Sequence, residues 1–383
     1  MKKAKRLIPV MVMVLAIAGL YTSCKKDETA SSGGKPRVLY VRVTNPASSD
    51  SLLTGAYQSN LIAIVGENLQ GAQQVWFNDQ RANLTPTYIT ATTILVSTPS
   101  QIPAAVDNKM KIVFKGGDTL FYDFKILIKE PAVSSMLSEY VLEGDIATIR
   151  GDFFYQPLTV TFTGGAEGEL VSVEDKIIKV KVPTGAQPGQ VTVKTNFGET
   201  KSDFWFRDTR NIFISSDPFT GWWNASFVVT SPGAGDPPSI NGNYIRVKKA
   251  IGAWAWTEVA GGPADAMGAI SKNIPDEAIL KPATYNLKFE LNTMKPYNNN
   301  MLKINVGLLE QNNDAYQWKP PYDTHGEWET VTIPFEEITA SYGAPLVVSP
   351  NGYWCRLLFH GPGDLDCDMS FDNFRVVPKI IKK

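Results

Sequence analysis

Short runs of alternating apolar and polar residues recur from residue 37 to the C-terminus. Val191–Thr195 is one example, and Lys176–Pro183, which ends at a proline, is another. Because successive side chains of a strand point to opposite faces, a period of two predicts half-buried β-strands. We find no long stretch with helical periodicity. The pattern therefore predicts an all-β protein built from small sandwiches.

The region from residue 37 to residue 208 contains one pattern twice. Gly66, Val75, Phe77 and Pro99 recur at an almost constant spacing as Gly151, Val160, Phe162 and Pro183. A shared spacing over this length predicts two copies of one domain, which we place at residues 37–130 and 131–208.

A third region, residues 209–383, differs in composition because it holds most of the nine tryptophans of the chain. These are Trp222, Trp223, Trp254, Trp256, Trp318, Trp328 and Trp354. About eight strands can be predicted here, among them Ala253–Val259 and Tyr353–His360. Such a number of strands with long loops fits a jelly-roll sandwich.

Two pairs of aromatic residues in this region are candidates for a binding platform. Trp254 and Trp256 are two positions apart in a predicted strand, as are Tyr316 and Trp318, so each pair is expected on one face. Flat rings suit a sugar, whose C–H face is apolar and whose hydroxyls need polar partners at the edge. The alternative is that some of these rings belong to the core, since tryptophan is usually mostly buried.

Alternation also suggests a polar partner for the rings. In the strand around residue 356, Cys355, Leu357 and Phe359 form a plausible core set, which puts Trp354 and Arg356 on the opposite face. Arg356 is then a candidate hydrogen-bond donor to neighbouring sugar hydroxyls. Pairing of Arg356 with a nearby carboxylate is an equally good interpretation.

The N-terminus predicts export. Residues 1–23 combine a basic start with the apolar run Leu7–Leu20, which is typical of a signal peptide. The sequence Tyr21–Cys24 resembles a bacterial lipobox, which implies a lipid on Cys24 and anchoring to the outer membrane. A cleaved signal with a chance cysteine is the alternative. Residues 24–36 are expected to be a flexible tether.

Charge and cysteine content narrow the function. Without its basic leader the chain is mildly acidic, which argues against a nucleic-acid surface. Cys355 and Cys367 lie at equal distances on either side of Gly361, as expected of facing positions on a hairpin. In an exported protein they form either a disulfide or two free buried thiols.

An enzyme is not expected. The chain has two histidines, His325 and His360, and no metal-hydrolase motif. Paired carboxylates for glycoside hydrolysis are available in the third region, which is small for a hydrolase that must also build a cleft. They are Glu258, Asp265, Glu310, Asp314, Glu327, Glu329, Asp364 and Asp366. No cofactor is expected, although Asp364, Asp366 and Asp372 could hold a structural calcium ion, as in related sandwiches.

The repeated region resembles the IPT/TIG family of immunoglobulin-like domains. The second copy carries the motifs of that family most fully, in Gly144–Gly151, Val160–Phe162, Ile178–Pro183 and Gly189–Val193. The resemblance implies two immunoglobulin-like sandwiches that serve as rigid spacers or interaction modules.

The third region resembles carbohydrate-binding modules in Gly326–Pro334, where the resemblance implies that Trp328 is core, and in Ser370–Val377. The whole chain resembles the surface glycan-binding lipoproteins of Bacteroidetes polysaccharide-utilisation loci, especially those that bind xyloglucan or another β-glucan. This implies a non-catalytic glycan platform made of Trp254, Trp256, Tyr297, Tyr316, Trp318, Tyr322 and Arg356. The implied partners are an outer-membrane glycan importer and surface glycoside hydrolases, with the protein itself a monomer. The alternative is an adhesive lipoprotein whose sandwich binds a protein.

Overall fold

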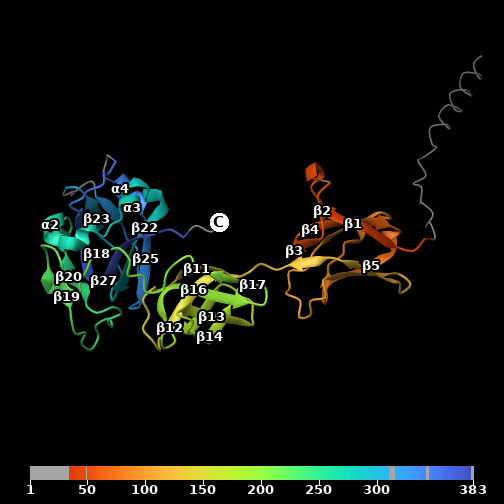
Figure 1. Ribbon diagram of the computed structural model, residues 1–383, viewed down its shortest axis with the longest axis horizontal. Helices are drawn as coiled ribbons and strands as arrows, with labels where there is room; N and C mark the ends of the chain where they lie inside the picture. Colours follow the sequence, from red (N-terminus) through yellow and green to blue (C-terminus); the bar gives the residue numbers. More distant parts are fainter. Residues whose placement is uncertain (1–33, 49, 310–314, 342–344, 381–383) are drawn as a thin grey trace, which may run out of the picture. The chain divides into compact units, whose positions relative to one another are not determined.

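The computed structural model describes residues 34–48, 50–309, 315–341 and 345–380. The chain divides into two compact units, Met1–Lys129 and Glu130–Lys383, and Figure 1 colours it from red to blue along the sequence. Both units are built from β-sheets, so the predicted all-β class is confirmed. The predicted signal peptide and Cys24 lie outside the described residues. Among the residues described, none belongs to a helix long and apolar enough to cross a bilayer.

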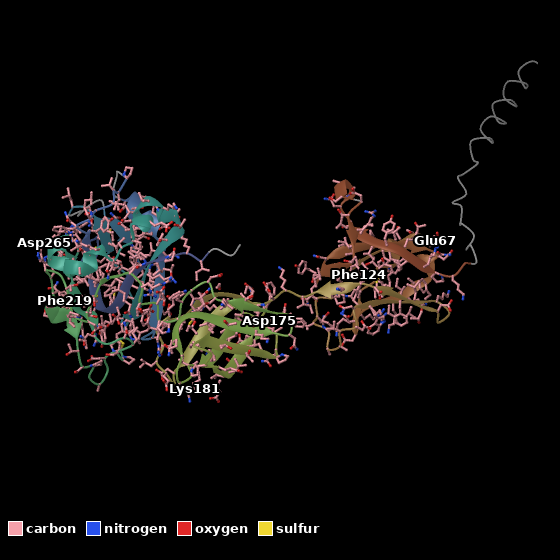
Figure 2. All side chains as sticks on the ribbon, in the orientation of Figure 1. Glu67, Phe124, Asp175, Lys181, Phe219 and Asp265 are labelled. Carbon is pink, nitrogen blue, oxygen red and sulfur yellow. The ribbon has the colours of Figure 1, made fainter. Side chains whose placement is uncertain are left out.

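The first unit packs two four-stranded sheets around one core. One sheet has the order β2 (Leu52–Leu53), β1 (Arg37–Val43), β4 (Leu61–Glu67), β7 (Thr93–Ser97); the other has the order β6 (Gln80–Ala82), β5 (Ala72–Phe77), β8 (Lys109–Phe114), β9 (Thr119–Asp123). A parallel pair, β3 (Gly55–Tyr57) and β10 (Lys125–Leu127), adjoins them. Ile64, Phe77 and Phe124 are buried in this core, and Figure 2 labels Phe124 within it.

The second unit begins with a smaller sandwich of the same kind. One sheet has the order β11 (Ala132–Met136), β12 (Ile146–Asp152), β15 (Ile177–Lys181), β14 (Glu169–Glu174); the other has the order β13 (Leu158–Thr163), β16 (Gln187–Thr195), β17 (Gly198–Lys201). Strands β11, β12 and β15 are joined in the order in which β1, β4 and β7 are joined in the first unit. Residues 133–206 supply a hydrophobic core of its own.

The glycine that recurs in both copies, as Gly66 and Gly151, is required for the same structural reason in each. A Cβ on Gly66 would lie 2.1 Å from the carbonyl oxygen of Arg37, and a Cβ on Gly151 would lie 1.9 Å from that of Ala132. In each copy the neighbouring strand has a register shift at this point, so the two backbones approach too closely for a side chain.

The C-terminal part of the second unit is a larger sandwich. Its first sheet has the order β19 (Val228–Val229), β20 (Tyr244–Ile251), β27 (Leu365–Pro378), β22 (Tyr285–Thr293), β25 (Trp328–Pro334), with β18 (Ile212–Ile214) also paired to β27; its second has the order β21 (Thr257–Gly262), β26 (Trp354–Phe359), β23 (Leu302–Gly307), β24 (Tyr316–Trp318). Helices α2 (Ala264–Met267), α3 (Asp276–Leu280) and α4 (Phe335–Ala340) are short. Phe213, Phe289 and Phe371 lie in the core between the sheets, and Phe219, labelled in Figure 2, packs against it.

A buried ion network joins the two sandwiches of the second unit. Nη2 of Arg375 donates to Glu139 Oε2 at 2.6 Å and to Glu290 Oε1 at 2.9 Å, and Lys288 also pairs with Glu139. Backbone contacts add to it, since Thr330 N donates to the carbonyl oxygen of Leu137 at 2.8 Å. These contacts explain why residues 130–383 form one compact unit.

The predicted strand Ala253–Val259 is wrong in its first half. β21 begins at Thr257, and Trp254 has a φ of 59°, which belongs to a turn and not to a strand. The turn is held in place because Trp254 N donates to the carbonyl oxygen of Gly361 at 2.7 Å. Trp254 and Trp256 are therefore positioned by the turn and not by strand alternation.

Cys355 and Cys367 are free and buried, so the disulfide interpretation is wrong. The hairpin that it required does not form, because β26 and β27 belong to different sheets. Cys355 pairs across its sheet with Val306, and Cys367 pairs across the other sheet with Lys249. Burial raises the pKa of the Cys367 thiol to about 12 and raises that of Cys355 as well.

Candidate functional site

Strand β26 separates the core of the C-terminal sandwich from its outer face. Cys355, Leu357 and Phe359 are fully buried in the core, as their alternation predicts. Trp354 and Arg356 alternate with them and therefore point to the outer face of the sheet β21-β26-β23-β24. The candidate site is built on this face.

Arg356 lies at the centre of the outer face and is paired with Glu258 of β21. Its Nε donates to Glu258 Oε2 at 2.9 Å, and its Nη2 donates to the other carboxylate oxygen. The Trp256 indole N–H also donates to Glu258, at 2.7 Å. Only 3% of the Arg356 side chain is exposed. Of the two interpretations of Arg356, the structure shows the ion pair, and Arg356 acts on the face by positioning its rings.

The Arg356 guanidinium connects two groups of tryptophans. It lies 5.0 Å from the ring centre of Trp223 and 4.8 Å from that of Trp256, both within the range of cation–π attraction. Trp222, Trp223 and Trp354 form one group, in which Trp222 packs edge-on against Trp223 at 5.8 Å and against Trp354 at 5.6 Å.

His360 holds the second group of rings. Its ring centre is 5.5 Å from that of Trp254 and 4.9 Å from that of Trp256. We call the whole set the aromatic face; it consists of Trp222, Trp223, Trp254, Trp256, Trp354, His360, Arg356 and Glu258. Trp222, Trp254 and Trp256 are the most open of its rings, with exposed fractions of 59%, 58% and 48%.

Glycines and turns fix the aromatic face to the sheet. Trp222 N donates to the carbonyl oxygen of Gly261 at 2.8 Å, and Gly261 leaves no room for a side chain because a Cβ there would lie 2.0 Å from the carbonyl oxygen of Cys355. At the other group of rings, Ala253 N donates to the Asp364 carboxylate at 2.8 Å. The rings are thus held in place before any ligand arrives, which lowers the entropic cost of binding.

The chemistry of the aromatic face is that of binding. Large exposed indoles arranged around one buried ion pair present flat apolar surfaces to an apolar sugar face. Glu258, the carboxylate of the face, is engaged by both Arg356 and Trp256. Its oxygens are thus occupied by donors of the protein itself.

Tyr297, which the sequence placed in the platform, is not on this face. Its ring is fully buried, and its hydroxyl donates to the carbonyl oxygen of Trp318 at 2.8 Å and accepts from Leu302 N at 2.9 Å. A ring without exposed surface cannot lie under a sugar. The prediction for Tyr297 is therefore wrong.

Tyr316 and Trp318 share one face of β24, as predicted, but it is the inner face. Tyr316 pairs across the sheet with Ile304 and Trp318 with Leu302, and both partners belong to the core. Tyr322 packs against Trp318 at 5.3 Å. These three rings form a separate group at the edge of the sandwich, away from the aromatic face.

Trp222, Trp223, Trp354 and His360 belong to the aromatic face but were not predicted as site residues. A signal for Trp354 and His360 was present, since alternation in β26 placed both beside Arg356. No periodicity links Trp222 and Trp223 to that strand, because both precede β19 in a segment without strand character. The only sequence signal for Trp222 and Trp223 was the high concentration of tryptophans in this region.

The calcium hypothesis finds no cluster to support it. Asp364 accepts from Ala253 N, Asp366 pairs with Lys295 at 2.6 Å, and Asp372 is buried in β27. Throughout the part of the chain that the structure describes, no group of three or more His, Cys, Asp or Glu residues could hold a metal ion. Glu310 and Asp314 lie outside the described residues.

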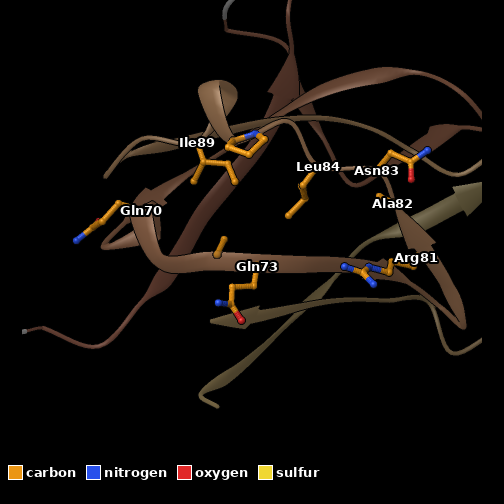
Figure 3. A pocket seen from close by; sticks show the side chains of 9 residues that line it. Gln70, Gln73, Arg81, Ala82, Asn83, Leu84 and Ile89 are labelled. Atoms are coloured by element: carbon orange, nitrogen blue, oxygen red, sulfur yellow. The ribbon is translucent and has the colours of Figure 1, made fainter. Parts of the chain in front are cut away.

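The first unit contains a hollow whose lining differs in chemistry from the aromatic face. It has a volume of about 580 Å³ and is shown in Figure 3. Gln70, Gln73, Arg81 and Asn83 supply polar groups around it, with Leu84 and Ile89 among its apolar members. Its nine described lining residues include no aromatic ring, so it lacks the feature that marks the aromatic face.

Comparison with known proteins decides the family of the third region. Residues 206–378 match the family model "Surface glycan-binding protein B xyloglucan binding domain". The matched region contains the whole aromatic face, from Trp222 to His360, and the resemblance predicted from the sequence is confirmed.

Two relatives extend the comparison beyond the xyloglucan-binding domain. An IPT/TIG domain-containing protein of Bacteroides ovatus is 29% identical over 157 residues, which cover 39% of this chain and 31% of the relative's own length. The solved surface glycan-binding protein PbSGBP-B of Prevotella bryantii aligns with a TM-score of 0.70 and 24% identity, over 90% of this chain and 99% of that one. The second comparison shows that the fold is shared over nearly the whole length.

Proposed function

We propose that this protein binds a neutral β-glucan, most simply xyloglucan, on the aromatic face without changing it chemically. The observation that carries the proposal is the set of exposed rings held around the Arg356–Glu258 pair, in a domain whose family is defined by xyloglucan binding. Stacking of pyranose rings on indoles supplies the affinity, and the fixed spacing of the rings supplies selectivity.

The same proposal includes the cellular context. A lipid on Cys24 anchors the chain at the outer membrane, and the two IPT/TIG-like sandwiches act as a spacer for the binding domain. The captured polysaccharide is then passed to an outer-membrane importer and to surface hydrolases, with the protein acting as a monomer. The family of the C-terminal domain and the lipobox-like sequence support this context.

Affinity electrophoresis tests the binding. Residues 24–383 are run through gels that contain xyloglucan, mixed-linkage glucan, laminarin, galactomannan, xylan or starch. We expect xyloglucan to retard the protein and the double variant Trp254→Ala/Trp256→Ala to lose at least about tenfold in affinity, as happens when aromatic rings that a ligand covers are truncated. Leu280→Ala is the control, because Leu280 is exposed on α3 and lies outside the aromatic face.

Two outcomes contradict the proposal. One is equal retardation of the double variant and the wild type, which would place the site elsewhere. The other is no retardation by any of these polymers together with specific capture of a protein ligand, which would favour an adhesive function.

A further inference from the structure

A cleft lies where both sheets of the C-terminal sandwich end. β24 is the last strand of one sheet and β25 is the last strand of the other. Between them is an open hollow of about 330 Å³. Tyr316, Trp318 and Tyr322 line it on one side, and Val331 and Ile333 of β25 line it on the other. We call this hollow the edge cleft.

The rings of the edge cleft are fixed by the core behind them. Trp318 packs edge-on against Phe289 at 5.7 Å and is tilted by 30° to Tyr297 at 5.1 Å. Tyr316, Trp318 and Tyr322 are each only partly buried, so part of every ring remains open to the cleft. The cleft therefore presents rigid aromatic surface to a ligand.

The polar groups of the edge cleft are hydroxyls and carboxylates. Tyr316 OH donates to Glu337 at 3.3 Å and Tyr322 OH donates to Glu329 at 3.2 Å, both longer than an ordinary O–H···O bond. Burial raises the pKa of Tyr322 to about 12 and raises that of Tyr316, so both hydroxyls stay neutral. A ligand hydroxyl can therefore take the place of either tyrosine–glutamate hydrogen bond, and no strong hydrogen bond of the protein is lost.

This composition selects among possible ligands. The described lining residues include the carboxylate of Glu337 and no lysine or arginine, which disfavours an anionic ligand such as a uronic-acid polymer. A peptide strand is also disfavoured at this edge. Thr330 N is already bonded to Leu137, and Pro334 has no N–H to offer, so two positions of β25 cannot donate to a new ladder.

We propose that the edge cleft is a second glycan-binding site, which takes a segment of the same neutral polysaccharide that the aromatic face binds. This inference rests on the proposed function. Two sites on one domain raise the apparent affinity for a long polymer by linking two weak contacts, whereas a short oligosaccharide occupies each site separately.

Fluorine NMR of protein labelled with 5-fluorotryptophan tests the edge cleft separately from the aromatic face. Trp318, Trp254 and Trp256 report on the two sites, and single tryptophan-to-phenylalanine variants assign their signals. Xylogluco-oligosaccharides are the titrant. We expect the Trp318 signal to shift, and to do so still in the double variant Trp254→Ala/Trp256→Ala.

A matched pair of variants tests the contact itself. Glu337→Gln removes the carboxylate that faces the cleft, and Glu336→Gln changes its neighbour on α4, which pairs with Lys379 instead. We expect Glu337→Gln to weaken the affinity read from the Trp318 signal by about threefold or more, as loss of one ordinary hydrogen bond does, and Glu336→Gln to leave it unchanged.

The outcomes distinguish the two proposals. If the signals of Trp254 and Trp256 shift to saturation while that of Trp318 stays fixed, the edge cleft is not a glycan site and the proposed function stands. If Trp318 shifts only when the aromatic face is intact, its shift is indirect and the cleft proposal is overturned. If no tryptophan signal responds to xylogluco-oligosaccharides, the choice of xyloglucan fails and the cleft proposal fails with it.

Discussion

Arg356 shows how one side chain organises the aromatic face without being exposed. Its guanidinium donates hydrogen bonds to the Glu258 carboxylate. The same planar group lies close to the rings of Trp223 and Trp256. A lysine at this position keeps the charge but has neither the fork nor the plane. If the aromatic face binds glycan as proposed, we expect the guanidinium to contribute through the rings beside it.

The variant Arg356→Lys tests this positioning effect. We expect about a tenfold loss of affinity for xyloglucan, because two rings lose the surface against which they pack. Isothermal titration calorimetry gives the affinity, and tryptophan quenching by acrylamide shows whether the rings move. Unchanged affinity in a folded variant would mean that the rings hold their places without Arg356.

A second residue, Asp372, makes stability depend on pH. It is buried in β27, and its Oδ2 has no hydrogen-bond partner among the described residues. Burial raises its pKa well above the ordinary value, and the nearby carboxylates Asp217 and Glu290 raise it further. The folded chain therefore holds a proton here at a pH where the unfolded chain has released it.

The sign of the effect follows from proton linkage. Asp372 ionises at about pH 4 in the unfolded chain, so stability falls as pH rises from there to the folded pKa, by up to about 1.4 kcal/mol per pH unit. We expect Asp372→Asn to remove this decline. The stability of the variant relative to the wild type should therefore be higher at pH 7 than at pH 4. Urea unfolding at several pH values measures it. The same pH dependence in variant and wild type would contradict the assignment.

At the scale of the element, the two repeated glycines carry matching predictions. Each glycine lies opposite a register shift in the neighbouring strand. A Cβ on either glycine would lie about equally close to a carbonyl oxygen of that strand. Gly66→Ala should destabilise the first unit, and Gly151→Ala the second, by about 1–3 kcal/mol, since overpacking forces the backbones apart.

Gly71→Ala is the control for both glycine variants. The nearest atom to a Cβ there is in Phe114 at 3.8 Å, an ordinary contact. Denaturant unfolding followed by circular dichroism gives the free energies of unfolding. If Gly71→Ala costs as much as Gly66→Ala, the close approach of the backbones is not the cause.

At the scale of the whole molecule, the ion network around Arg375 couples the two sandwiches of the second unit. Arg375→Met would leave Glu139 and Glu290 buried with one cation fewer. Removing one partner of a buried ion pair costs about 3–5 kcal/mol. We expect the second unit to unfold at a lower temperature and the first unit to be unaffected, which makes it an internal reference.

Scanning calorimetry of the full chain measures both units at once. Lys281→Met is the control, because it breaks an ion pair with Glu277 in which both side chains are mostly exposed, and such pairs contribute at most about 1 kcal/mol. Equal effects of the two variants would show that the network does not hold the sandwiches together.

The sequence predicted those features that depend on local pattern. Alternation in β26 placed Cys355, Leu357 and Phe359 in the core, and the spacing of Gly66 and Gly151 predicted the repeat. Trp254 and Trp256 were predicted to share one face of a platform, although a turn and not a strand positions them. The pattern put Tyr316 and Trp318 on one face of β24 but could not show whether that face is core or platform, because both use aromatic rings.

Features that depend on contacts distant in sequence were missed. Trp222 and Trp223 reach the aromatic face because the loop that carries them is hydrogen-bonded to β21, through Trp222 N and the carbonyl oxygen of Gly261. Tyr297 is buried because its hydroxyl is satisfied by Trp318 and Leu302, which a sequence pattern does not reveal. The interpretation of Cys355 and Cys367 failed because the chain changes sheets between β26 and β27.

The separation of these two thiols also has a practical consequence. Each lies in the core, on a different sheet, with its pKa raised by burial. A thiol-specific dye can react with them only after the core opens, because only the exposed thiolate is nucleophilic. The rate of labelling at Cys355 and Cys367 therefore measures how often the core of the C-terminal sandwich opens, at thiols that the natural sequence already supplies.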